Sequence, residues 1–292
     1  MPELPIESKT AIEQIFTSAD DIIKITDIEF LIRSNRKLPG IKNSLKVEDV
    51  VTFITEERLY RRLVFKFPSK TEIRYARPSR STYEVILTLR PNSYFTHLSA
   101  LFLHGLSDNP DNKIYLNWEQ KSKSVLSSEL TQDGINNAFA RPQRIPKQGK
   151  ASIDGYDVFI LNGKQTEQLG VIQIVNDQLG TVRVTDIERT LIDSTVRPEY
   201  AGGVKTVLES YKIAKQRKMI SESKIVSYLK SLCFIYPYHQ AIGFYMDRCQ
   251  MYSKKTLKSL LSFPIEFDFY LGYNMKDMEY SPRWRMFFPK DF

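Results

Sequence analysis

The spacing of apolar positions changes from helical to extended within the first eighty residues. Apolar residues recur three and four positions apart in 10–19, 26–32 and 47–63, which is the pattern of an amphipathic helix. Shorter apolar runs at 63–67 and 72–76 then flank a turn-forming segment and predict a β-hairpin. Helices followed by a hairpin are the element order of a winged helix-turn-helix, in which one helix enters the major groove and the hairpin tip approaches the phosphates.

A short polar segment at 78–82 follows the hairpin and is typical of a hinge. We therefore place a domain boundary there, with a winged-helix DNA-binding domain in 1–80 and a larger domain in 81–292. The larger domain starts with the alternating run 83–89, which predicts a strand. A helix capped by Thr96 is expected to follow, to run through 96–104, and to end at a left-handed glycine.

The rest of the larger domain mixes strand and helix patterns. We expect hairpin turns at Asp154-Gly155 and Asn162-Gly163, whose composition suits tight connections. The predicted class is α+β, with a mainly antiparallel sheet flanked by helices. Strands are predicted at 113–118, 152–161, 170–175, 182–184 and 263–273, and helices at 204–215, 221–232 and 238–250.

Segment 183–203 carries the most sharply delimited helix of the chain. Thr185 and Glu188 have the spacing of a capping box, so we expect a helix that begins at Asp186. Pro198 ends it, because the residue before a proline is disfavoured in the helical conformation. Arg189 lies four residues before Asp193 and is expected to pair with it on the wetter side of this helix.

The net charge of +8 is unevenly distributed. Acidic residues outnumber basic ones in 1–57, whereas in 58–80 the basic residues accompany a single acid, Glu72. This reversal coincides with the predicted hairpin and indicates a polyanionic partner, although a merely solvated charged surface is the alternative. The candidate DNA-binding residues are Arg58, Arg61, Arg62, Lys66, Lys70 and Arg74.

The helix that would enter the groove does not follow the same trend. It contains Glu48, Asp49, Glu56 and Glu57, and phosphates repel carboxylates, even though a carboxylate can accept from cytosine N4. Either this helix docks by its later turns, or the domain has a reduced role in DNA binding.

Few residues have the spacing of a chemical site. The three histidines, His97, His104 and His239, lack nearby cysteine or carboxylate partners at metal-ligand spacing. Cys233 and Cys249 are too few for a disulfide framework and do not have the spacing of a metal-binding pair. No phosphate loop or nucleophile motif is present in the sequence. We therefore predict no catalytic residue, no metal and no cofactor, and a chain that is not an enzyme. Without a long apolar run, we expect a cytoplasmic protein with no membrane partner.

Segment 183–203 resembles the hallmark sequence of AbiEi-type antitoxins, which belong to type IV toxin–antitoxin systems of abortive infection. Segments 89–106 and 138–144 resemble the same family in the same order. The resemblance implies an antitoxin in phage defence and a transcriptional repressor that binds inverted repeats in its own operator DNA. It also implies a nucleotidyltransferase-like toxin that is neutralised, typically without a stable complex. Arg189, Arg197 and Tyr200 would be the exposed residues of this antitoxin surface.

Two other functions remain open from the sequence. The chain could be a protein-interaction subunit of a phage-defence system that docks directly onto a toxin or nuclease, with the basic hairpin incidental. It could also bind RNA through a second basic run in 212–230. Stable co-elution with a neighbouring gene product would favour docking, and competition by RNA would favour the RNA-binding alternative.

Overall fold

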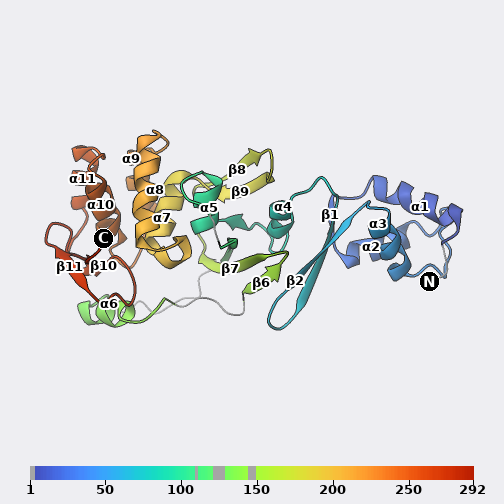
Figure 1. The fold of residues 1–292 in the computed structure, drawn as a ribbon, viewed down its shortest axis with the longest axis horizontal. Helices are drawn as coiled ribbons and strands as arrows, with labels where there is room; N and C mark the ends of the chain where they lie inside the picture. The colour runs from blue at the N-terminus through green and yellow to red at the C-terminus, as the bar shows by residue number, and fades with distance from the viewer. Residues whose placement is uncertain (1–3, 109–110, 121–128, 144–148) are drawn as a thin grey trace. The chain divides into compact units, whose positions relative to one another are not determined.

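The computed structural model describes two compact units, which are coloured by residue number in Figure 1. The described residues are 4–108, 111–120, 129–143 and 149–292. The first unit comprises 1–91, 151–155 and 175–182, and the second comprises 92–150, 156–174 and 183–292. No described helix is long and apolar enough to cross a membrane.

The first unit packs three amphipathic helices against a small sheet. Its strands follow one another in the order β1-β3-β2-β6, with antiparallel pairing throughout. Ile12, Ile28 and Ile54 are fully buried between the helices and the sheet, and the hydroxyl of Tyr60 donates to the carbonyl of Asp20 at 2.7 Å. The elements are α1 (Ile6–Thr17), β1 (Ile22–Ile23), α2 (Ile25–Ser34), α3 (Val47–Glu56), β2 (Arg61–Lys66), β3 (Thr71–Ala76), α4 (Thr82–Leu87) and β6 (Lys150–Ile153).

The third helix is shorter than the apolar spacing predicted. Helix α3 ends at Glu56 instead of continuing to Leu63. Arg58 adopts a left-handed conformation with φ of 56°, and the amide of Tyr60 turns back to donate to the carbonyl of Ile54. The chain therefore reverses before Leu63, which lies in β2, so Arg61 and Arg62 are strand residues and not helix residues.

The strand predicted at 83–89 is wrong, because these residues form α4. Ser81 caps this helix: its hydroxyl accepts from the amide of Glu84 at 3.1 Å, and its own amide donates to the Glu84 carboxylate at 2.8 Å. Such a capping box favours a helix whatever the alternation beyond it. The boundary predicted after residue 80 consequently lies inside the first unit, which continues to Pro91.

The second unit contains a sheet and a helical bundle. Its strands lie in the order β7-β5-β4-β9-β8, of which the end of β8 and the start of β9, within 175–182, belong to the first unit. A separate sheet has the order β10-β12-β11. The strands are β4 (Tyr94–Phe95), β5 (Lys113–Gln120), β7 (Tyr156–Lys164), β8 (Val171–Asn176), β9 (Gly180–Thr185), β10 (Phe269–Tyr270), β11 (Met278–Ser281) and β12 (Met286–Pro289). The helices are α5 (His97–Leu103), α6 (Gln132–Phe139), α7 (Ile187–Val196), η1 (Pro198–Ala201), α8 (Val204–Gln216), α9 (Glu222–Leu232), α10 (Tyr238–Cys249) and α11 (Lys254–Leu261).

The predicted α+β class with a mainly antiparallel sheet is confirmed, with a parallel centre. Strands β5 and β7 run parallel from the Lys113–Asp157 pair to the Gln120–Lys164 pair. The turn predicted at Asn162-Gly163 is therefore wrong, since both residues lie within β7. Asp154-Gly155 does form a turn, and both of its residues have positive φ.

Helix α7 lies at the centre of the second unit's bundle, among α5, α8, α9 and α10 (Figure 1). Leu191 and Ile192 are fully buried, and the rings of Tyr211 and Tyr245 stack 5.3 Å apart beside them. The strand predicted at 263–273 is mostly irregular, because only β10 pairs within it. The remaining bundle helices begin and end close to their predicted bounds.

Glu222 links three helices of this bundle and predicts a pH effect on stability. Its carboxylate pairs with Lys215 of α8 and accepts from the hydroxyl of Ser253 at 2.7 Å. Burial alone would raise the pKa of Glu222, but hydrogen bonds from Lys215, Thr256 and Ser253 lower it to about 2. A lowered folded-state pKa stabilises the fold above the unfolded value of about 4.3, and this contribution is lost as the pH falls toward about 2.

We therefore expect Glu222→Gln to reduce the free energy of unfolding at pH 6, with a difference from wild type that shrinks as the pH falls through about 4. Urea unfolding between pH 6 and pH 3 measures this difference. Glu266→Gln, at an exposed residue, controls for the loss of one negative charge. A difference that stays constant over this pH range would contradict the assignment.

Candidate functional site

The start of α7 differs from the predicted capping box. Asp186, not Thr185, is the N-cap, and its carboxylate accepts from the amide of Arg189 at 2.8 Å. Thr185 is buried, and its hydroxyl lies 2.7 Å from the hydroxyl of Thr190. Glu188 accepts from the amide of Ser221 at 2.6 Å, so its side chain joins α7 to the start of α9 and does not reach back along its own helix.

A buried ion pair lies on the next turn of α7. The Nε of Arg189 is 2.7 Å from the Oδ1 of Asp193, and their side chains are only 7% and 13% exposed. The guanidinium also donates to the carbonyl of Leu169 at 2.9 Å and to the hydroxyl of Thr166 at 3.3 Å. Burial alone would lower the pKa of Arg189, but the charge of Asp193 raises it above its ordinary value.

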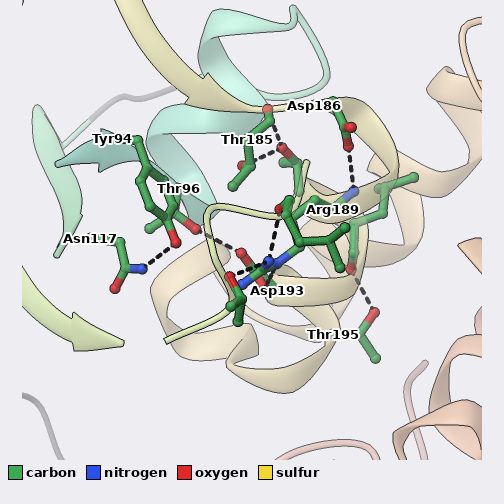
Figure 2. Close-up of polar contacts among 12 residues, drawn as sticks. Tyr94, Thr96, Asn117, Thr185, Asp186, Arg189, Asp193 and Thr195 are labelled. Carbon is green, nitrogen blue, oxygen red and sulfur yellow. Dashed lines mark hydrogen bonds and ion pairs between the residues drawn. The ribbon is translucent and has the colours of Figure 1, made fainter. Parts of the chain in front are cut away.

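The same pair joins α7 to the sheet, as Figure 2 shows. The hydroxyl of Thr96 donates to the second carboxylate oxygen of Asp193 at 3.1 Å. Next to it, the hydroxyl of Tyr94 accepts from the amide of Asn117 at 2.6 Å and donates to Glu119 at 2.9 Å. Segments 89–106 and 183–203, which resemble the antitoxin family, are therefore joined by buried polar contacts.

The third family-like segment reaches the same region from another side. The ring of Phe139, at the end of α6, stacks 4.4 Å from that of Tyr273. The hydroxyl of Tyr273 accepts from the guanidinium of Arg197, just after α7, at 2.7 Å. Arg144, the last residue of segment 138–144, lies outside the described residues.

Of the three predicted antitoxin-surface residues, only Arg197 is exposed. Arg189 is 6% exposed and Tyr200 is 7% exposed, and the ring of Tyr200 stacks 5.3 Å from that of Tyr115. The expectation that Arg189 and Tyr200 are exposed is therefore wrong. The sequence predicted that the Arg189–Asp193 pair lies on the more solvent-exposed side of α7, but Thr96 after β4 and the segment between β7 and β8, with Thr166 and Leu169, contact the pair on that side.

The carboxylates at the start of α7 are already paired. Lys224 of α9 lies between them, with its Nζ 2.9 Å from Asp186 and 3.1 Å from Glu188. Tyr228 also donates to Asp186 at 2.7 Å. Burial alone would lower the pKa of Lys224, but its hydrogen bonds to these two carboxylates raise it. This arrangement fixes α9 against α7 and leaves both carboxylates engaged.

Two histidines of this unit have lowered pKa values. Burial lowers the pKa of His97 to about 4, and its backbone has a left-handed φ of 52°. Burial also lowers the pKa of His104, whose Nε2 lies 2.7 Å from the carbonyl of Thr185. No group of three or more potential metal ligands occurs within the described part of the chain.

The basic residues of the first unit divide into accessible and engaged side chains. Arg58, Arg62 and Lys66 are exposed and have no side-chain partner among the residues that the structure describes. Lys70, in the β2–β3 turn, is 53% exposed and pairs with Glu72 at 2.7 Å. These four residues remain available to a polyanion.

Arg61 and Arg74 are not available in the same way. Arg74 is 5% exposed, donates to the hydroxyl of Thr88 at 3.1 Å and pairs with Glu72 at 3.1 Å. Arg61 is half-buried and donates to the carbonyl of Arg80 at 2.7 Å. The prediction that Arg74 contacts DNA is therefore wrong, because its guanidinium is part of the packing of α4 on the hairpin.

A comparison with models of known protein families finds no match, and neither does a comparison with curated proteins. Among solved structures, the fold is similar to the crystal structure of the RV2827C protein from Mycobacterium tuberculosis, with a TM-score of 0.58. The similarity covers 98% of this chain and 92% of that chain, at 11% sequence identity. It supports the mixed α and β architecture and concerns the fold alone.

The burial of Arg189 leads to a stability prediction. Arg189→Ala leaves the carboxylate of Asp193 buried without its charge partner, and we expect it to lower the free energy of unfolding by about 3–5 kcal/mol. Arg197→Ala removes an exposed arginine from the same segment and should cost less than about 1 kcal/mol. Urea unfolding measures both, and equal losses would show that the pair does not support the fold.

Proposed function

We propose that the chain is the antitoxin of a type IV toxin–antitoxin system in phage defence, and that it represses its own operon by binding operator DNA. One observation carries the proposal: the three segments that resemble the AbiEi family converge on the surroundings of α7. Segments 89–106 and 183–203 share the buried contact between Thr96 and Asp193. Phe139 of the third segment stacks on the ring of Tyr273, whose hydroxyl accepts from Arg197.

This convergence supports the resemblance on physical grounds. A buried ion pair is stable only when the remaining polar atoms around it are also satisfied, so it requires particular residues at several distant positions. Short sequence segments that resemble a family only by chance are not expected to supply residues that bond to each other in one such buried network. Here Arg189 and Asp193 come from one matching segment and Thr96 comes from another.

For the DNA-binding part, we propose that the first unit acts as a winged helix, with α2 and α3 as the helix-turn-helix and the β2–β3 hairpin as the wing. Its element order agrees with that motif. The exposed Arg58, Arg62 and Lys66 would neutralise phosphates, and Lys70 would join them by exchanging Glu72 for DNA. Because α3 is acidic at Glu48, we assign most of the affinity to the turn after α3 and to the wing.

For the toxin-directed part, we propose that Arg197 is the accessible contact of the family-like segment. The partner would be a nucleotidyltransferase-like toxin that is neutralised without a stable complex. We propose that this occurs without catalysis by the chain, since Asp186, Glu188 and Asp193 are each engaged by a neighbouring cation. The available chemistry is then that of charged, shape-matched surfaces.

The wing can be tested with the intact chain and duplex DNA from upstream of its own gene. We expect Arg62→Glu combined with Lys66→Glu to weaken binding by about tenfold or more, because two phosphate contacts are lost. The slope of log K against log salt should also fall by roughly 1.8, or about 0.9 for each contact. Fluorescence anisotropy at several salt concentrations measures both quantities.

The matched control is Lys255→Glu combined with Lys258→Glu on α11, where both lysines are exposed and the change of charge is the same. Its affinity should fall by much less, because only the long-range field changes. Equal effects of the two double variants on affinity and slope would show that the hairpin is not the DNA-binding element.

The toxin-directed part can be tested by coexpression with a nucleotidyltransferase-like neighbouring gene. Wild type should restore growth, and Arg197→Glu should not, because it reverses the charge of the exposed contact. Lys218→Glu, at another exposed residue, is the control. If all three proteins restore growth equally, Arg197 is not the contact. Stable co-elution of wild type with the toxin would favour the docking alternative.

A further inference from the structure

Strand β8 is an unusual sheet edge. It is last in the strand order, and within the described ranges no strand pairs with its outer side. The edge strand β1 has only two residues, and the edge strand β11 carries Glu279, features that discourage pairing with another chain. Strand β8 has six residues, Val-Ile-Gln-Ile-Val-Asn, with no charge and no proline.

Large apolar side chains of β8 are also exposed to solvent. Val175 is 79% exposed and Ile172 is 41% exposed, although both are large and apolar. Gln173, between them, is exposed as well. An uncharged apolar edge of this length is a template for the addition of another strand.

The sequence of this edge identifies the strand that fits it. Residues 171–175 read Val-Ile-Gln-Ile-Val in either direction, with Gln173 at the centre. Two antiparallel strands related by a two-fold axis place each residue opposite its mirror position. A palindromic strand therefore meets identical side chains when its partner is a second copy of itself.

We propose that β8 is a self-association edge, at which two copies of this chain pair through antiparallel β8 strands centred on Gln173. In this register Ile172 lies opposite Ile174 of the second copy, and Val171 lies opposite Val175 of the second copy. Since alternate residues share a face, the isoleucines gather on one side of the joined sheet and the valines on the other. The strand carries no charge, so the pairing brings no like charges together.

This inference stands independently of DNA binding and adds to the proposed function. A two-fold pairing is closed, so it ends at a dimer and does not continue into a fibre. A dimeric DNA-binding protein of this symmetry matches two-fold symmetric half-sites. The dimer would form in the absence of DNA, so its test does not depend on whether the wing binds an operator.

The first test is the mass of the intact protein by sedimentation equilibrium. We expect wild type to be a dimer and Val175→Lys to raise the dissociation constant about tenfold or more, because charged edge residues prevent pairing. Ile235→Lys, at a residue that is 74% exposed elsewhere, is the matched control and should remain a dimer. A monomeric wild type, or a dimer unaffected by Val175→Lys, would overturn the proposal.

The second test fixes the register by oxidation of introduced cysteines, in a Cys233→Ser background that removes the one exposed thiol among the described residues. Gln173→Cys places the two new thiols opposite each other, so we expect a covalent dimer on non-reducing gels. Val175→Cys places each new thiol opposite Val171 and should give far less. Equal cross-linking, or none from Gln173→Cys, would overturn the register.

Discussion

The second unit depends on one buried ion pair, between Arg189 and Asp193. Neither charge can stay in the interior without the other, and each also needs hydrogen bonds to its remaining polar atoms. Thr96 supplies such a bond from the sheet, and the carbonyl of Leu169 supplies another from the loop before β8. The position of α7 against the sheet therefore follows from satisfying these two charges.

Sequence periodicity predicted the parts of the fold that depend on one amphipathic helix at a time. Helices α8, α9 and α10 bury a regular stripe, and their bounds follow from it. The failures are local events that outweigh periodicity: a capping box at Ser81 made a helix from an alternating run, and the left-handed Arg58 ended α3 early. One or two residues decide each of these, so a pattern averaged over a window cannot detect it.

The candidate site shows a similar division between what could be predicted and what could not. The sequence showed that basic residues are concentrated in 58–80, but the number of them that are free to bind a partner depends on ion pairs with Glu72. This one carboxylate engages Lys70, Arg74 and Arg90. Lys70, Glu72 and Arg74 alternate, so in a strand they lie on one face. That spacing was the available signal that part of the positive charge is used within the fold.

The burial of the family-like segment bears on where function resides. Because Arg189, Thr190 and Tyr200 are enclosed, a resemblance in this region reports the way the chain packs more directly than it reports a contact surface. Proteins with the same buried network can then differ in the partners they bind, since those partners meet only exposed residues. Under the proposed function and the proposed self-association, recognition would be encoded on accessible positions such as Arg62 and Val175, where packing places little restriction on sequence.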